Sequence, residues 1–293
     1  MINNYKKFPI KIFGIDFTSA PSKRKTLVCA EGYGKSRSIL TVKNLKYWDN
    51  FKKFEELLIK KGPWIGGFDF PFGLPIVFLN KINLPLDWKK YVNIIGKLTK
   101  KELEQTVIDF KSVRPKGQKD LPRITDSINR AKSPLKTINP PLIKMFYEGA
   151  KRLLDSGISV IPFHLPKDDR IAFETYPALL TRLVVNSYKS ESAYKNKEKL
   201  KASRQKILDG ILSSYLIKNL GFSLNINDVI KKIIIEDNSG DSLDSVLCCI
   251  QAYWAFLQDM HYVSFNSKID PKIKSEGWII SPKLPPSNQS KNY

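Results

Sequence analysis

Two apolar runs, each ending on an aspartate, constrain the fold of this chain more than any other feature of its sequence. Residues Ile10–Asp16 (IKIFGID) and Trp64–Asp69 (WIGGFD) are rich in β-branched and aromatic residues and have the length of buried strands. Asp16 and Asp69 therefore stand at the carboxyl ends of two strands. In open sheets with crossover connections, ligands bind at these ends.

The segments between the two runs predict how these strands pair. Strands are expected at 26–32 and 36–42, joined by a turn at 32–34, and a helix at 48–61 ends at Gly62-Pro63. Three strands with short connections form an antiparallel meander, whereas a helix between two strands requires a crossover and parallel pairing. The sequence thus predicts an α/β fold with a mixed sheet.

The rest of the chain is expected to complete one domain over residues 1–280. Residues 70 to about 138 contain six prolines and amphipathic helical patches, which indicates a mostly helical insertion. Residues 281–293 have almost nothing to bury and are expected to form a disordered tail. The further elements expected are strands at 158–163 and 170–177 and helices at 141–156, 177–186, 191–219, 226–235 and 241–260.

The supply of reactive side chains points to carboxylate chemistry. With two histidines and three cysteines, none in metal-ligand spacing, a zinc site or a His-based mechanism is disfavoured. Cys29, Cys248 and Cys249 are expected to be small buried core residues. Carboxylates are the ligands that Mg²⁺ prefers, and two-metal phosphoryl transfer needs several of them at one place.

Five carboxylates are the candidates for such a site: Asp16, Asp69, Glu174, Asp241 and Asp244. Asp241 and Asp244 are three residues apart at the start of an apolar helix, so they share one face of it. Acids at these positions also suit helix capping and the helix dipole, and Asp16 also suits a turn. Asp69 and Glu174 stand among aromatic residues, where an unpaired carboxylate is costly to bury.

The charge balance favours a polyanionic partner. The chain has 49 Lys and Arg against 28 Asp and Glu, a formal net charge of +21. Such a surface attracts nucleic acid, although scattered lysines also suit ordinary solvated faces. The candidate phosphate-binding residues are Thr18, Ser19, Arg123, Arg130, Lys132, Lys189 and Arg204. For those around Arg123, a solvated helix with an Asp126–Arg130 pair is the alternative.

Eight segments, taken in order, resemble the family called domain of unknown function 429. They are GIDFTSAP, GGFDFPFGLP, RITDSINRAKSP, NPPLIKMFYEGAKRLL, FETYP, SYK, GDSLDSVLCC and EGWI, and they cover about residues 10 to 280. The family is identified as predicted nucleases with a ribonuclease H-like fold. The resemblance implies that Asp16, Asp69, Asp241 and Asp244 hold Mg²⁺ or Mn²⁺, with two ions expected, and it leaves the role of Glu174 open.

The preferred hypothesis is a metal-dependent nuclease that hydrolyses phosphodiester bonds of DNA or RNA. One alternative is a non-catalytic nucleic-acid-binding protein on the same fold. Another is a phosphotransferase like actin or the sugar kinases. Such an enzyme needs Gly-rich loops that bind phosphate, and the glycine pairs of this chain, at 32–34 and 66–67, are not placed for that role.

The N-terminus lacks a signal-peptide core and the longest apolar stretch is short for a membrane span, so we expect a cytoplasmic protein without membrane contact.

Overall fold

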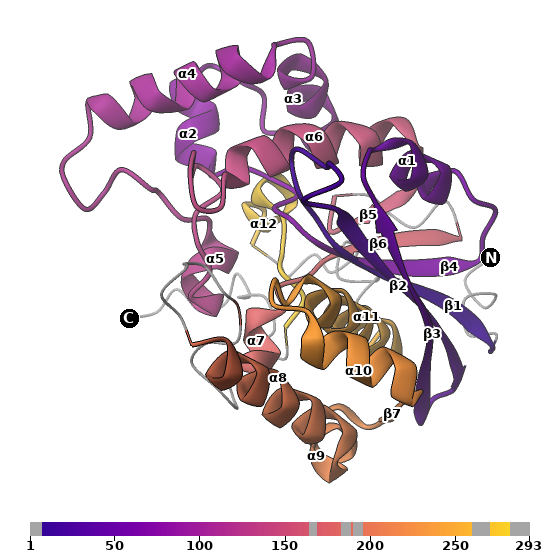
Figure 1. Ribbon diagram of the computed structural model, residues 1–293. Helices are drawn as coiled ribbons and strands as arrows, with labels where there is room; N and C mark the ends of the chain where they lie inside the picture. Colours follow the sequence, from indigo (N-terminus) through magenta and orange to yellow (C-terminus); the bar gives the residue numbers. More distant parts are fainter. Residues whose placement is uncertain (1–7, 164–168, 183–188, 190–195, 260–269, 282–293) are drawn as a thin grey trace, which may run out of the picture.

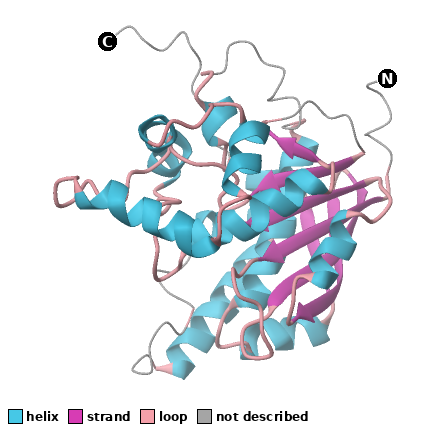
Figure 2. Ribbon diagram, turned by 90° about the horizontal axis from the view of Figure 1, so that it is seen from above, coloured by secondary structure: helices cyan, strands magenta, loops and turns pink. Residues whose placement is uncertain are grey.

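Helices cover both faces of a single mixed sheet (Figure 1; Figure 2). The computed structural model describes residues 8–163, 169–182, 189, 196–259 and 270–281. In this part of the chain seven strands form the sheet, in the order β5-β6-β4-β1-β2-β3-β7. The expected α/β class with a mixed sheet is therefore confirmed, whereas the tail expected from residue 281 lies, from 282 onward, outside the described residues.

The first three strands form the predicted antiparallel meander. They are β1 (Ile10–Asp16), β2 (Leu27–Ser36) and β3 (Ile39–Trp48). The turn expected at 32–34 is wrong, because the chain turns at 37–38 and both glycines lie inside β2. Gly32 lies at a β-bulge, and a Cβ atom on Gly34 would lie 2.4 Å from the ring of Tyr253. These glycines allow close approach by neighbours instead of reversing the chain.

The other four strands each run parallel to a neighbour. They are β4 (Trp64–Asp69), β5 (Ser159–Ile161), β6 (Arg170–Glu174) and β7 (Ser223–Ile226). Helix α1 (Lys52–Leu58) supplies the predicted crossover from β3 to β4. The sequence pattern does not predict β7, a strand of four residues that pairs with β3 at the edge of the sheet.

One face of the sheet packs against the C-terminal half of the chain. Ile10, Ile12 and Ile65 point to this face and share a core with the buried helix α11. The helices of this half are α7 (Ala178–Thr181), α8 (Lys197–Leu212), α9 (Ser214–Leu220), α10 (Asp228–Glu236) and α11 (Asp241–Leu257). The single helix expected at 191–219 is thus two helices, separated at Ser213, whose backbone is extended. Residues 183–186 and 191–195 of the expected helices lie outside the described residues.

The opposite face packs against helices of the predicted insertion and of the segment that follows it. Phe13, Ile15 and Phe68 point to this face and share a second core with these helices. They are α2 (Ile76–Lys81), α3 (Trp88–Ile95), α4 (Lys100–Ser112) and α6 (Leu142–Asp155). Helix α5 (Ile124–Asn129) also belongs to the insertion, but its Ile128 packs against the first core. A short helix near the C-terminus, α12 (Ile273–Glu276), lies beside α3 and α5 (Figure 1).

Helix α11 lies unusually close to the two central strands. A Cβ atom on Gly14 of β1 would lie 2.0 Å from the carbonyl oxygen of Ser245. A Cβ atom on Gly67 of β4 would lie 2.4 Å from the carbonyl oxygen of Cys248. Because any side chain at these positions would collide with the helix backbone, the two glycines set the height of α11 above the sheet. This contact brings the first turn of α11 to the carboxyl ends of β1 and β4.

Candidate metal centre

Three carboxylates from three separate elements converge at one end of the sheet. Asp16 and Asp69 are the last residues of β1 and β4, and they are register partners in this parallel pair. Side chains alternate between faces along a strand, so Asp16 follows Ile12 and Gly14 onto the face that α11 covers. Asp244 lies in the first turn of α11. One carboxylate oxygen from each of the three lies within 4.8 Å of the others.

A lysine ammonium lies among these carboxylates. The Nζ atom of Lys189 contacts Asp244 and lies 3.9 Å from an oxygen of Asp16 and 3.6 Å from an oxygen of Asp241. The other oxygen of Asp241 accepts a hydrogen bond of 3.0 Å from Nζ of Lys25. Asp241 thus faces two lysines at the rim of the cluster, whereas Asp16, Asp69 and Asp244 converge on one point.

The nearby lysines do not fully offset the burial and mutual repulsion of these carboxylates. Burial raises the pKa of Asp16 well above its usual value, Lys189 lowers it, and the neighbouring aspartates raise it further. Burial likewise raises the pKa of Asp69 to about 8, with an added contribution from the charge of Asp244. Bringing like-charged carboxylates together in a partly dry site is unfavourable unless a cation joins them.

The donor set fits a hard divalent cation. All three converging groups offer carboxylate oxygen, which suits Mg²⁺ and Mn²⁺ better than softer metals. The ammonium of Lys189 shows that this group of oxygens accommodates a positive charge. A divalent ion would supply the charge that the cluster needs.

The raised pKa of Asp69 predicts that the metal-free protein loses stability as the pH rises. Between about pH 4 and about 8 the unfolded chain has released this proton while the folded protein still binds it. The free energy of unfolding should therefore fall through this window, by up to roughly 1.4 kcal/mol per pH unit for one such group. Urea unfolding in the presence of a chelator, repeated across the window, measures this slope.

The Asp69→Asn variant isolates the contribution of this group. Its slope should be shallower than that of the wild type, although Asp16 still contributes. Asp109→Asn, on the exposed side of α4, is the matched control and should leave the slope unchanged. Equal slopes for the wild type and Asp69→Asn would show that Asp69 titrates normally.

Glu174 lies on the other face of the sheet and does not join this cluster in the structure. Its register partner is Phe68, which points away from α11, so the alternation that directs Asp69 toward α11 directs Glu174 toward the insertion. There its carboxylate accepts hydrogen bonds from the backbone N–H of Phe72, at 2.9 Å, and from Arg123. Glu174 thereby fixes the loop that follows Asp69.

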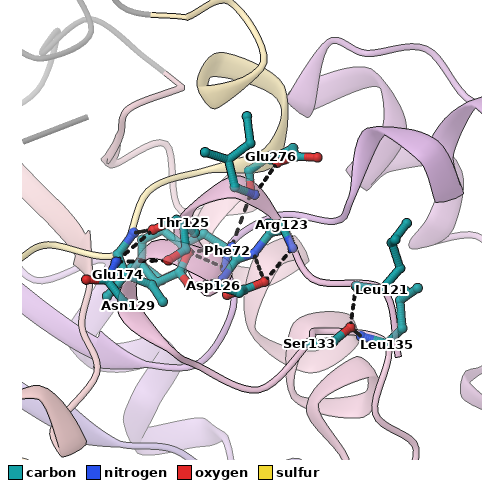
Figure 3. Close-up of polar contacts among 12 residues, drawn as sticks. Phe72, Leu121, Arg123, Thr125, Asp126, Asn129, Ser133, Leu135, Glu174 and Glu276 are labelled. Atoms are coloured by element: carbon teal, nitrogen blue, oxygen red, sulfur yellow. Dashed lines mark hydrogen bonds and ion pairs between the residues drawn. The ribbon is translucent and has the colours of Figure 1, made fainter. Parts of the chain in front are cut away.

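Arg123 is a buried hub that joins the insertion to the sheet and to the C-terminal segment (Figure 3). Its guanidinium donates two hydrogen bonds to Asp126, at 2.8 and 3.0 Å, and two to Glu174. It also donates to the carbonyl oxygen of Glu276. Burial alone would lower the pKa of Arg123, but the two carboxylates raise it well above its usual value. The Asp126–Arg130 pair that we considered does not form, since Asp126 pairs with Arg123.

The remaining predicted phosphate-binding residues fall into two groups. Thr18, Ser19 and Lys132, like Lys189, line a cavity of about 500 Å³ that contains the carboxylate cluster. Arg130 is exposed and does not line it. Arg204 is buried on α8, where it donates to the carbonyl oxygen of Ile235 at 2.9 Å. We therefore do not include Arg130 and Arg204 in the proposals below.

The sequence analysis does not single out three residues that line the cavity: Lys25, Tyr176 and Arg182. Lys25 is one of many lysines, and only the 3.0 Å contact with Asp241 distinguishes it. Tyr176 lies in the FETYP segment and Arg182 follows α7. Tyr176 and Arg182 lie near the carboxylates because of the path of the chain after β6, and local sequence patterns do not predict that path.

Comparisons with protein families, with curated proteins and with solved structures found no match for this chain. The resemblance to domain of unknown function 429 therefore stays a prediction. In the described part of the chain, no helix has both the length and the apolar character needed to cross a membrane. The three cysteines are free and buried, as predicted.

Proposed function

We propose that this protein is a metal-dependent nuclease with a ribonuclease H-like arrangement of its sheet. The observation that carries this proposal is the convergence of Asp16, Asp69 and Asp244 within 4.8 Å at the carboxyl ends of two parallel strands. Burial of the cluster and the raised pKa values of Asp16 and Asp69 favour a bound cation over ordinary solvated acids.

The strand order supports the ribonuclease H-like arrangement. An antiparallel meander, β3-β2-β1, continues into the parallel strands β4 and β6, with acids at the ends of β1 and β4. A third acid opens a buried helix that crosses the same strands. This is the combination implied by the resemblance to domain of unknown function 429.

Each residue of the site has a proposed role. Asp16, Asp69 and Asp244 would hold Mg²⁺ or Mn²⁺, and the second ion that two-metal chemistry uses would draw on Asp241. Such ions supply Lewis-acid stabilisation and lower the pKa of water. Asp241 holds the ammonium of Lys25, and Lys189 contacts both Asp244 and Asp241, so these two lysines can neutralise substrate phosphates. The hydroxyls of Thr18 and Ser19 line the same cavity and can donate to phosphate oxygens.

The net charge of +21 favours a nucleic-acid substrate over a small phosphate ester. Lysines beyond the cavity would contact the backbone on either side of the cleaved bond. Binding should therefore weaken steeply with salt, because each phosphate contact releases counterions.

Cleavage assays test the proposal directly. Labelled single-stranded, duplex and branched DNA and RNA are incubated with the purified protein in Mg²⁺, Mn²⁺ or a chelator. We expect cleavage that requires metal, that is lost in Asp16→Asn and that is kept in the control Asp109→Asn. Cleavage that persists in Asp16→Asn, or that ignores the chelator, would contradict the proposal. Binding without cleavage on every substrate would favour the non-catalytic alternative.

The phosphotransferase alternative gains no support from the glycines that it would need. Gly66 and Gly67 lie inside β4, where Gly67 faces α11, and Gly32 and Gly34 lie inside β2. Glycines in strands, packed against neighbours, do not form a loop around phosphates. These four positions have a packing role instead.

A further inference from the structure

The cavity beside the carboxylates has a second part, which differs from the first in chemistry. One end carries the aspartates and lysines described above. Another part of the lining is apolar or aromatic and comes from the chain that follows β6 and from the start of α6 with the residues just before it, namely Tyr176, Pro177, Ala178, Pro140, Pro141 and Met145. A volume of about 500 Å³ lies within the range of cavities that take small organic groups. A metal and a phosphate need no such apolar surface.

Tyr176 is held rigidly within this lining. Its backbone N–H donates to the side-chain oxygen of Gln251 at 2.7 Å, and its carbonyl accepts from the side-chain nitrogen of Gln251 at 2.7 Å. Gln251 is buried on α11, so this two-point contact fixes Tyr176 to the helix that carries Asp244. The preceding residue, Thr175, donates its N–H to the carbonyl of Phe68 in β4.

Arg182 packs against the Tyr176 ring and braces it. Its guanidinium donates to the Tyr176 hydroxyl at 2.6 Å and to the carbonyl of Asn129 at 3.1 Å, and its carbon Cζ lies 5.1 Å from the centre of the Tyr176 ring. Arg182 is exposed and lines the cavity, and Tyr176 is half-buried. The two side chains form a braced shelf, which we call the Tyr176–Arg182 shelf.

The shelf lies in the electrostatic field of the metal centre. Burial raises the pKa of the Tyr176 hydroxyl, Arg182 lowers it, and the negative charge of Asp69 raises it again. Because the shelf and the carboxylates line the same cavity, a ligand on the shelf would lie near a group bound at the carboxylates. The chemistry of such a ligand combines an anionic part, for the metal and lysines, with a flat apolar part, for the shelf.

We propose that the Tyr176–Arg182 shelf binds the base of an unpaired nucleotide whose phosphate lies at the carboxylate cluster. This inference rests on the proposed nuclease function and specifies its substrate as single-stranded or locally unpaired nucleic acid. Aromatic side chains and guanidinium planes stack on bases only when the bases are released from their own stack. The base of an intact duplex could not reach the shelf while its phosphate lies at the aspartates.

Equilibrium binding in Ca²⁺, a cation that also takes carboxylate oxygens as ligands, tests the shelf by affinity and not by cleavage. The probes are a labelled oligothymidylate, an abasic strand with the same number of phosphates, and a duplex, all measured by fluorescence anisotropy. We expect the wild type to bind oligothymidylate about tenfold more tightly than the abasic strand, since one stacked base contributes on this order. Tyr176→Ala should bring this ratio close to one, and Tyr176→Phe should keep it.

Two further variants make the test decisive. Arg182→Gln changes an exposed side chain, so the fold should persist, and it should also reduce the ratio. Tyr33→Ala changes a half-buried tyrosine of β2 that does not line the cavity, and it should leave the ratio unchanged. A wild type that does not bind oligothymidylate, or that binds both single strands equally, would overturn the shelf even if the protein cleaves nucleic acid. A base-dependent ratio that needs Tyr176, without cleavage, would support the shelf and contradict the nuclease.

Discussion

Replacing Asp244 with Asn should lower the affinity for Mn²⁺ by at least about a hundredfold, because the loss of an outer partner of a metal ligand already costs about 10- to 100-fold. Metal-dependent cleavage should fall with it. Asp244 is almost fully buried, and its carboxylate converges with those of Asp16 and Asp69 within 4.8 Å. Asn keeps the shape of the side chain and removes only its charge.

The neighbouring acid provides a sharp comparison. Asp241→Asn should lower Mn²⁺ affinity by no more than about tenfold, the lower end of that range, because Asp241 faces Lys25 and Lys189 instead of the point of convergence. Titration calorimetry with Mn²⁺ measures both affinities. The stabilisation of the folded protein by Mn²⁺ gives a second readout, since only binding to the folded state raises the melting temperature. Equal losses of Mn²⁺ affinity in the two variants would show that Asp241 contributes as much to metal binding as Asp244 does.

Replacing Arg123 with Met should destabilise the protein by about 3–5 kcal/mol, the cost of leaving buried carboxylates without their partner. Arg123 is 2% exposed and engages both Asp126 and Glu174. Met fills much of the same volume, so the loss reports on charge and hydrogen bonds more than on a cavity. Chemical unfolding with urea measures it.

Arg152 is the matched control, because it also engages two carboxylates, those of Glu55 and Glu148. The side chain of Arg152 is 26% exposed and that of Glu55 is 52% exposed, so solvent screens this pair. Glu148 is 11% exposed but also pairs with Lys100, so it keeps a partner when Arg152 is lost. Arg152→Met should therefore cost no more than about 1 kcal/mol. If Arg123→Met were equally mild, the two buried acids would be protonated or hydrated in the variant, and the hub would not be essential for stability.

The strands that carry the site were predictable, because their signals are local. Apolar runs at Ile10–Asp16 and Trp64–Asp69 have the same bounds in the structure. The turn before β3 is misplaced in the prediction because Gly32 and Gly34 are typical turn residues. Within β2, a bulge that brings Gly32 close to Thr41 and the packing of Tyr253 on Gly34 account for them. Strand β7 escaped prediction because four residues carry little pattern, and its pairing with β3 depends on tertiary contacts.

The candidate site was predictable in part. Side chains alternate between the two faces of the sheet along each strand, and this alternation decides which of the predicted acids reach the cluster. Asp16 and Asp69 each come directly after a residue that faces away from α11, Ile15 and Phe68, so both point toward α11 and reach the cluster. Glu174 also ends a strand next to aromatic residues, but it follows Phe173, which faces α11, and so it points the other way. Following the alternation of faces along β6 from its core residues would have predicted that Glu174 points away from Asp16 and Asp69.

The partners of these acids could not be found from local patterns. Lys25 and Asp241 are 216 residues apart in the chain, and Arg123 and Glu174 are 51 apart. Each pair forms only when the sheet, the insertion and the last helix are assembled. The sequence shows which residues carry charge, and the fold decides which charges meet.

The contact of Gly14 and Gly67 with α11 makes the candidate metal centre resistant to most changes elsewhere in the core. Two backbones in direct contact act as a rigid spacer, so the distance between the strand ends and Asp244 does not depend on the sizes of the surrounding apolar side chains. Those side chains are then free to diverge over time, as long as the core stays filled. A single added methyl group at either glycine, by contrast, would lift the helix and separate the carboxylates. In distant relatives, these two small residues should be as informative a signature as the acids themselves.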